Sequence, residues 1–228
     1  MSIEHLPGGL VPPPGNPPTA PVEAMLANHP ALASAVDSLV AAYGVIVASQ
    51  EYGGSLYLCG NGGSMADALH ISAELLKSFV LPRPLDAGKR RLLAEAGLDG
   101  KMLGQVLQRG MCALVLGLNH SLTSALENDV STQGIGYAQE LLAVARAGDV
   151  LLGISTSGNA RNVCYAAQVA RALDMAVIGL TGQGGGKLAS LAHITIRAPA
   201  TETGRAQEYH QPLYHCLCKM LEIHFFGG

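Results

Sequence analysis

Short apolar runs alternate with longer helical patterns through most of this chain, and that alternation limits the folds open to it. The apolar runs read as buried strands at 55–59, 113–117, 149–154, 176–180 and 193–197. Between them lie helical patterns at 65–79, 121–127, 134–146, 160–173 and 187–191, and a closing helix is expected over 208–226. Strands joined through helices pair in parallel, so we predict an α/β fold: a doubly wound parallel sheet flanked by helices.

The N-terminal part of the chain departs from this alternation. Residues 1–21 are rich in Pro and Gly without an apolar period, which predicts a flexible arm. Across 22–52 apolar residues recur at spacings of three and four, which predicts an N-terminal helical segment with a break at Pro30. We expect 22–228 to form a single domain, with 80–109 as an atypical insertion. Its basic cluster, Lys89-Arg90-Arg91, suits either a solvated face or a site for a phosphate or a partner.

Charge and cysteine usage exclude several classes of protein. The formal net charge of −3 argues against broad binding to nucleic acid or anionic lipid. No uninterrupted apolar run approaches the roughly 18 residues that span a bilayer, so no membrane partner is expected. Residues 1–20 lack a basic region followed by an apolar one, so no secretory signal is expected either. Five scattered cysteines without zinc-ribbon spacing predict reduced, buried thiols and a cytoplasmic protein.

Two turns rich in glycine and hydroxyl groups follow the first and third apolar runs. In Asn61-Gly62-Gly63-Ser64 the glycines let backbone N–H groups approach an anion, and a helix N-terminus adds partial positive charge. Ser155-Thr156-Ser157-Gly158-Asn159 has the same character. Both also suit plain turns, with Ser64 as a helix N-cap. Because parallel strands end at one edge of the sheet, the two turns together predict one pocket for a phosphorylated small molecule.

Two more groups of residues could carry chemistry. His70 and Glu74 stand four apart, so they share one helix face and could bind a divalent metal, move a proton or form a simple ion pair. On the closing helix His215 faces the same side as Gln211, whereas Gln207 lies about 12 Å away along the axis. Spacing does not decide which of the two glutamines is the neighbour of His215. Pro212 is expected to disturb this helix.

These motifs together resemble the phosphoheptose isomerase family of the sugar isomerase (SIS) domain superfamily. The matching motifs are Cys59-Gly60-Asn61-Gly62-Gly63-Ser64, His70-x-x-x-Glu74, Asn128-Asp129, the segment 148–159, and Gln207-Glu208-x-His210 with His215. The resemblance covers about 22–226. It implies a SIS-type sheet, a homotetramer with active sites between subunits, and bound zinc. It also implies interconversion of sedoheptulose 7-phosphate and D-glycero-D-manno-heptose 7-phosphate, the first step toward the heptose of the lipopolysaccharide core.

The resemblance also assigns roles to individual residues. It places the phosphate on four hydroxyl residues, Ser64, Ser155, Thr156 and Ser157. The remaining substrate contacts would be Asn61, Gly62, Asp129 and Gln207. The zinc ligands would be His70, Glu74, Gln207 and His215, of which Glu74 and His215 are also the acid/base pair. The chain departs from the family pattern at Ala160, which replaces a serine, at Met65 and at the insertion.

The leading hypothesis is aldose–ketose isomerisation through an enediol or enediolate. Glu74 would move the proton between neighbouring carbons, and His215 would protonate oxygen or assist ring opening. Zinc could polarise the carbonyl, although a carboxylate bound tightly to zinc is a poor base. Two alternatives are an isomerase of another sugar phosphate, with specificity altered by 80–109, and a non-catalytic SIS protein that binds a sugar phosphate or tethers a partner.

Overall fold

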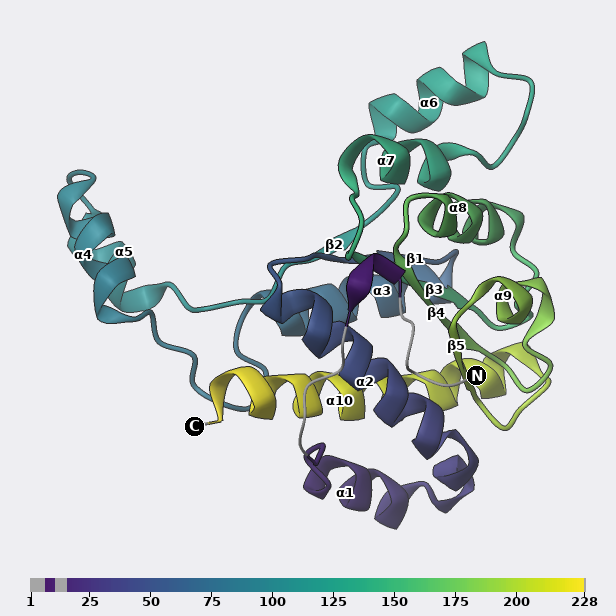
Figure 1. Ribbon diagram of the computed structural model, residues 1–228, viewed down its shortest axis with the longest axis horizontal. Helices are drawn as coiled ribbons and strands as arrows, with labels where there is room; N and C mark the ends of the chain where they lie inside the picture. The colour runs from purple at the N-terminus through teal and green to yellow at the C-terminus, as the bar shows by residue number, and fades with distance from the viewer. Residues whose placement is uncertain (1–6, 11–15, 228) are drawn as a thin grey trace.

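A computed structural model describes residues 7–10 and 16–227. The sheet contains β1 (Leu56–Cys59), β2 (Ala113–Val115), β3 (Val150–Ser155), β4 (Ala176–Thr181) and β5 (Ile194–Arg197). Its order is β2-β1-β3-β4-β5, and each neighbouring pair is parallel. The predicted parallel α/β sheet is therefore confirmed (Figure 1). Of the arm expected at 1–21, the structure describes 7–10 and 16–21, where Pro7–Gly9 form a short 3-10 helix and the first α-helix begins at Ala20. The prediction for the other residues of the arm lies outside the described part.

Helices cover both faces of the sheet because its central strands are apolar on both sides. Leu56 and Leu58 of β1 face one buried cluster, whereas Tyr57 and Cys59 face the other. The first cluster is covered by α1 (Ala20–Asn28), α2 (Val36–Glu51), α3 (Gly63–Leu76) and α10 (Thr203–Phe226). The second is covered by α7 (Gly136–Val144), α8 (Arg161–Ala172) and α9 (Gly186–Leu191). The two clusters make one three-layered body.

The N-terminal helical segment packs as a layer of this body. A short 3-10 helix, Pro30–Ala35, joins α1 to α2 at the expected break. By length and composition Pro30–Glu51 could cross a membrane, since its mean hydropathy is 1.8. Half of its apolar window is buried inside the protein, however, and the core helix of a globular protein meets the same criteria. The apolar surface of α2 is thus largely used for packing on the sheet.

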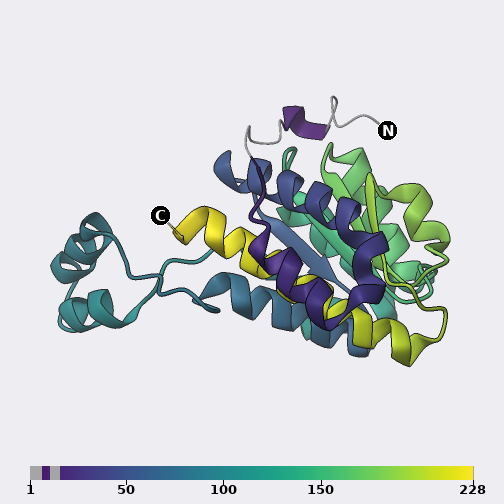
Figure 2. The ribbon, with the colours of Figure 1, turned by 90° about the horizontal axis from the view of Figure 1, so that it is seen from below.

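The insertion forms a helical hairpin that stands away from the body (Figures 1 and 2). Its helices are α4 (Ala87–Glu95) and α5 (Gly100–Val106), which pack on each other. A β-carbon at Gly100 would meet the carbonyl oxygen of Leu93, so the close contact requires glycine there. At the base of the hairpin Pro84 bridges Gln108, and the Arg109 N–H donates to the Arg83 carbonyl at 2.8 Å. The chain therefore leaves and re-enters the body at one point.

Two helices differ from the sequence expectations in informative ways. The helix expected to reach residue 79 ends at Leu76, because the N–H groups of Phe79 and Val80 donate to the Glu222 carboxylate instead of to helical carbonyls. Conversely, α10 begins at Thr203 and continues through Pro212 to Phe226. The N-terminus of α10 is capped by Glu202, which accepts from the N–H groups of Gly204 and Arg205.

Candidate active site

The two turns meet where the strand order reverses. From β1 the sheet continues to β2 on one side and to β3 on the other, and ligands of open α/β sheets bind beyond the strand ends at such a point. A cavity of about 370 Å³ opens there, lined by Asn61, Gly62, Gly63, Ser64, Ile154, Ser155, Thr156, Ser157, Ala160, Thr203 and Gln207. The structure thus brings all four predicted phosphate hydroxyls into one cavity, together with Asn61, Gly62 and Gln207.

Glycines shape the first turn for this cavity. Gly62 is the N-cap of α3 and has a φ of 54°, a conformation that favours glycine. A β-carbon on Gly63 would lie 2.5 Å from Gln207 Nε2, so the backbone and the α10 side chain approach closely only because residue 63 has no side chain. Ser64 is buried inside the first turn of α3 and is not its cap. The N-cap interpretation of Ser64 is therefore wrong, and its hydroxyl is available to the cavity.

Two residues that sequence reasoning missed hold Asn61 in place. The side-chain amides of Asn61 and Asn162 exchange hydrogen bonds of 2.8 Å in both directions. The Tyr137 hydroxyl donates to the Gly60 carbonyl at 2.6 Å and to Asn61 Oδ1 at 3.2 Å. Burial raises the pKa of Tyr137 to about 12, so this hydroxyl remains a donor at neutral pH. No short motif marks either residue, because both act through tertiary contacts.

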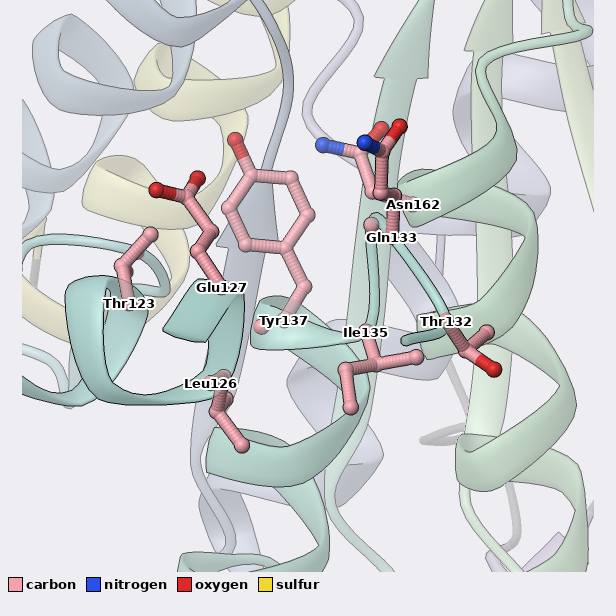
Figure 3. A pocket seen from close by; sticks show the side chains of 11 residues that line it. Thr123, Leu126, Glu127, Thr132, Gln133, Ile135, Tyr137 and Asn162 are labelled. Atoms are coloured by element: carbon pink, nitrogen blue, oxygen red, sulfur yellow. The ribbon is translucent and has the colours of Figure 1, made fainter. Parts of the chain in front are cut away.

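Tyr137 and Asn162 also line a second, smaller hollow of about 200 Å³. Figure 3 shows Thr123 and Glu127 beside Tyr137, with Gln133 and Asn162 on the other side. The two helices nearest it are α6 (His120–Asp129) and α7. Asp129 lines neither of these two cavities. It is exposed at the end of α6, where Asn128 donates to its carboxylate at 2.8 Å.

The acid/base candidates meet on α3 and α10, farther along these two helices from the cavity. α3 and α10 run side by side in the same direction, with Gly63 beside Gln207 at one end and Phe79 beside Glu222 beyond the other. Between these points Glu74 Oε1 lies 3.1 Å from His70 Nε2 and 3.3 Å from His215 Nε2. The structure therefore brings His70, Glu74 and His215 together, whereas Gln207 lies at the cavity between the two turns.

Burial sets the electrostatics of this cluster. It raises the pKa of the Glu74 carboxyl, whose side chain is only 7% exposed. It lowers the pKa of His215, as do the nearby His70 and Lys219. Burial also raises the pKa of Asp67, one turn before His70, to about 6. At neutral pH the arrangement therefore favours a basic Glu74 carboxylate beside a neutral His215 imidazole.

The donor set fits a metal ion such as zinc. The three side chains each offer one ligand atom, and these atoms lie within 4.8 Å of one another. Both Glu74 oxygens and His215 Nε2 are buried without a well-aligned hydrogen-bond partner in the described part of the chain. His70 Nδ1 lies 3.0 Å from the Tyr214 hydroxyl, a contact that orients the ring as outer partners of metal-binding histidines do. Two imidazoles and a carboxylate are typical zinc ligands.

Comparison with known proteins assigns this chain to a family. A phosphoheptose isomerase from Akkermansia muciniphila is 32% identical over 201 residues, which cover 88% of this chain and 93% of the relative. One from Rhodospirillum rubrum is 37% identical over 84% of this chain and 88% of the relative. The chain belongs to the phosphoheptose isomerase family. The SIS domain family, in turn, matches residues 100–182.

Solved structures of this phosphoheptose isomerase family agree with the fold. The phosphoheptose isomerase of Neisseria gonorrhoeae superposes with a TM-score of 0.68 at 31% identity, covering 88% of this chain and 94% of that one. That of Francisella tularensis gives a TM-score of 0.67 at 27% identity, covering 89% and 92%. The predicted family and the predicted SIS-type fold are both confirmed.

Proposed function

We propose that this chain is an aldose–ketose isomerase that interconverts sedoheptulose 7-phosphate and D-glycero-D-manno-heptose 7-phosphate. The observation that carries the proposal is the contact of Glu74 Oε1 with His215 Nε2 at 3.3 Å, between two helices that both begin at the anion cavity. Family membership confirms the expected class of enzyme. This reaction would be the first step toward the heptose of the lipopolysaccharide core, as the family resemblance implies.

The length of α3 suits a long substrate. Ser64 and Glu74 are about 15 Å apart along the axis at 1.5 Å per residue. The Glu74 side chain leans toward the helix N-terminus and shortens that distance. An extended seven-carbon sugar phosphate measures about 10 Å from phosphorus to C1, taking eight bonds of about 1.5 Å in a zigzag. Such a molecule can hold its phosphate in the cavity and present C1 and C2 to Glu74, which a pentose phosphate reaches less well.

The residues divide the reaction between them. Ser64, Ser155, Thr156 and Ser157 would bind the phosphate, and Asn61 and Gly62 would line the sugar. Glu74 would remove the proton from the carbon beside the carbonyl and return it to the neighbouring carbon, through an enediol or enediolate. The raised pKa of Glu74 makes it a stronger base than an exposed carboxylate. The adjacent His215 would carry the proton between the two sugar oxygens or assist ring opening.

Zinc would be held by His70, Glu74 and His215. Gln207, which the family resemblance assigns as the fourth donor, lies at the cavity in the single chain. When bound, it would supply polarisation of the sugar carbonyl. Glu74 cannot serve fully as ligand and as base at once, because coordination neutralises its negative charge. Comparing turnover before and after treatment with a chelator therefore decides which of the two roles limits the reaction.

We also propose that the chain forms a homotetramer with active sites at subunit interfaces and that this enzyme works in the cytoplasm. Apolar side chains left uncovered on α3 and β2 support the assembly, since Leu69, Leu76 and Leu114 are 42–49% exposed in the single chain. The net charge of −3 and five free cysteines support a cytoplasmic small-molecule enzyme without a nucleic-acid or membrane partner. Four of the five thiols are buried as expected, whereas Cys112 is exposed. Sedimentation of the purified protein measures the number of subunits.

The test of the function is an NMR time course with a panel of five- to seven-carbon ketose phosphates, with and without chelator. We expect conversion of sedoheptulose 7-phosphate to exceed that of the shorter sugars. A preference for a shorter sugar would support the alternative isomerase, although no residue of the insertion lines the cavity of its own chain and the hairpin stands away from the body (Figure 1). Binding without turnover, insensitive to changes at Glu74 and His215, would support the non-catalytic alternative.

A further inference from the structure

Arg83 is a buried cation with no part in the chemistry described above. The residue is 1% exposed. Its Nη1 donates to the Leu75 carbonyl at 2.9 Å, and its Nη2 donates to the Glu74 carbonyl at 3.0 Å. Its Nε donates to Glu222 Oε1 at 2.8 Å. One guanidinium therefore binds the last turn of α3 and a carboxylate of α10 at the same time.

Glu222 completes this connection from the side of α10. Its carboxylate is 1% exposed and accepts the N–H groups of Phe79 and Val80, both at 2.9 Å. These two residues follow shortly after the end of α3. The pair thus holds the C-terminal end of α3 to α10 through hydrogen bonds to backbone groups.

The connection acts on the two residues that the proposed mechanism needs. The carbonyl that Arg83 Nη2 binds belongs to Glu74 itself. His215 stands two turns before Glu222 on α10, about 10 Å along the axis. We propose that Arg83 and Glu222 are positioning residues that hold the Glu74 carboxylate against the His215 imidazole. The inference rests on the proposed function, since it assigns a purpose to the distance between those two groups.

Stability alone explains this pair poorly. Burying both charges carries a large desolvation penalty, and apolar replacements of such pairs are often neutral or stabilising. The Arg83 guanidinium aims a fork of donors at two successive carbonyls of α3, those of Glu74 and Leu75. A planar guanidinium provides that fork, and a lysine ammonium does not. Arg83→Lys is therefore the most informative variant, because it keeps the charge beside Glu222 and removes the geometry.

The test compares Arg83→Lys with Arg109→Lys. Both arginines stack on the Phe226 ring, at 4.5 and 5.0 Å, but the Arg109 side chain makes no hydrogen bond to α3 in the described part of the chain. In Arg83→Lys we expect kcat to fall about 10- to 100-fold, since small misplacements of catalytic groups have effects of that size. KM and the inhibition constant of inorganic phosphate should stay within about twofold, because the anion cavity lies at the other end of α3. Arg109→Lys should leave all three values unchanged.

A second readout does not depend on turnover. The ring ¹⁵N signals of His215, assigned by their loss in His215→Gln, should shift in Arg83→Lys and stay in place in Arg109→Lys. If Arg83→Lys fails to fold, Arg83→Met/Glu222→Gln removes both charges, keeps an acceptor oxygen for one of the N–H groups of Phe79 and Val80, and should show the same loss of kcat.

The outcomes separate the two proposals. A folded Arg83→Lys protein with wild-type kcat and unshifted His215 signals would overturn the positioning role. Wild-type protein that does not convert sedoheptulose 7-phosphate would overturn the proposed function. In that event a shift of the His215 signals in Arg83→Lys would still support the positioning of Glu74.

Discussion

Removing one hydroxyl, in Tyr137→Phe, tests how the anion cavity is held. The Tyr137 hydroxyl donates to the Gly60 carbonyl at 2.6 Å and touches Asn61 Oδ1 at 3.2 Å, and the residue is 9% exposed. Phenylalanine would leave the Gly60 carbonyl without this donor. It would also leave the Asn61 side chain held from one side only, by Asn162.

The size of the expected effect follows from the two hydrogen bonds of this hydroxyl. Leaving a buried polar group without its partner costs about 1–3 kcal/mol, so we expect the free energy of unfolding to fall by ~1.5 kcal/mol. For a domain of this size that corresponds to a Tm lower by about 3–6 °C. If half of the same energy also holds Asn61 against the substrate, KM for sedoheptulose 7-phosphate should rise about threefold to fivefold, with a smaller effect on kcat.

Tyr57→Phe provides the matched control. Tyr57 is buried, and its hydroxyl donates to the Val144 carbonyl at 3.2 Å, away from the two turns. Thermal unfolding and steady-state kinetics of both variants, measured side by side, separate the two effects. Both should lose stability, but only Tyr137→Phe should raise KM. Equal KM values in the two variants would refute the claim that Tyr137 shapes the site through Asn61.

Three further predictions concern other parts of the molecule. Ser155→Ala removes a buried hydroxyl from the cavity. In steady-state kinetics KM should rise about 10- to 100-fold, because a hydrogen bond to a charged group is lost, and kcat should change far less. Replacing residues 85–107 by a short glycine linker should lower the Tm by no more than about 4 °C in thermal unfolding, because the hairpin packs on itself; a larger decrease would show that it supports the body. In thiol titration at pH 8 the native protein should react at the exposed Cys112 alone. Burial raises the pKa of Cys59 to about 12 and that of Cys216 to about 11, and Cys164 and Cys218 are also buried. All five thiols should react after denaturation.

Features set by local pattern could be predicted from the sequence. The strands stand out because each is a short apolar run between helical patterns, and the alternation itself dictates parallel pairing. The two turns rich in glycine and hydroxyl groups could be placed at one sheet edge for the same reason. The contact between Glu74 and His215 followed from the family resemblance, since helical spacing left the neighbour of His215 open.

Features set by long-range contacts could not be predicted. The pairing of Arg83 with Glu222 joins residues far apart in the chain, and no periodicity links them. The early end of α3 has the same origin, because Glu222 takes the N–H groups that would have continued the helix. Amphipathic pattern also does not show what a helix packs against, so the outward projection of α4 and α5 was not visible in the sequence.

The most direct measurement of the central claim is solvent deuterium incorporation at C1 and C2 of sedoheptulose 7-phosphate by wild-type protein and by Glu74→Gln. Glutamine preserves the shape of the side chain and cannot accept the carbon-bound proton. We predict rapid exchange in the wild type and loss of exchange in the variant, with phosphate binding and thermal unfolding intact. Exchange at the wild-type rate in a folded Glu74→Gln protein would contradict the assignment of Glu74 as the base.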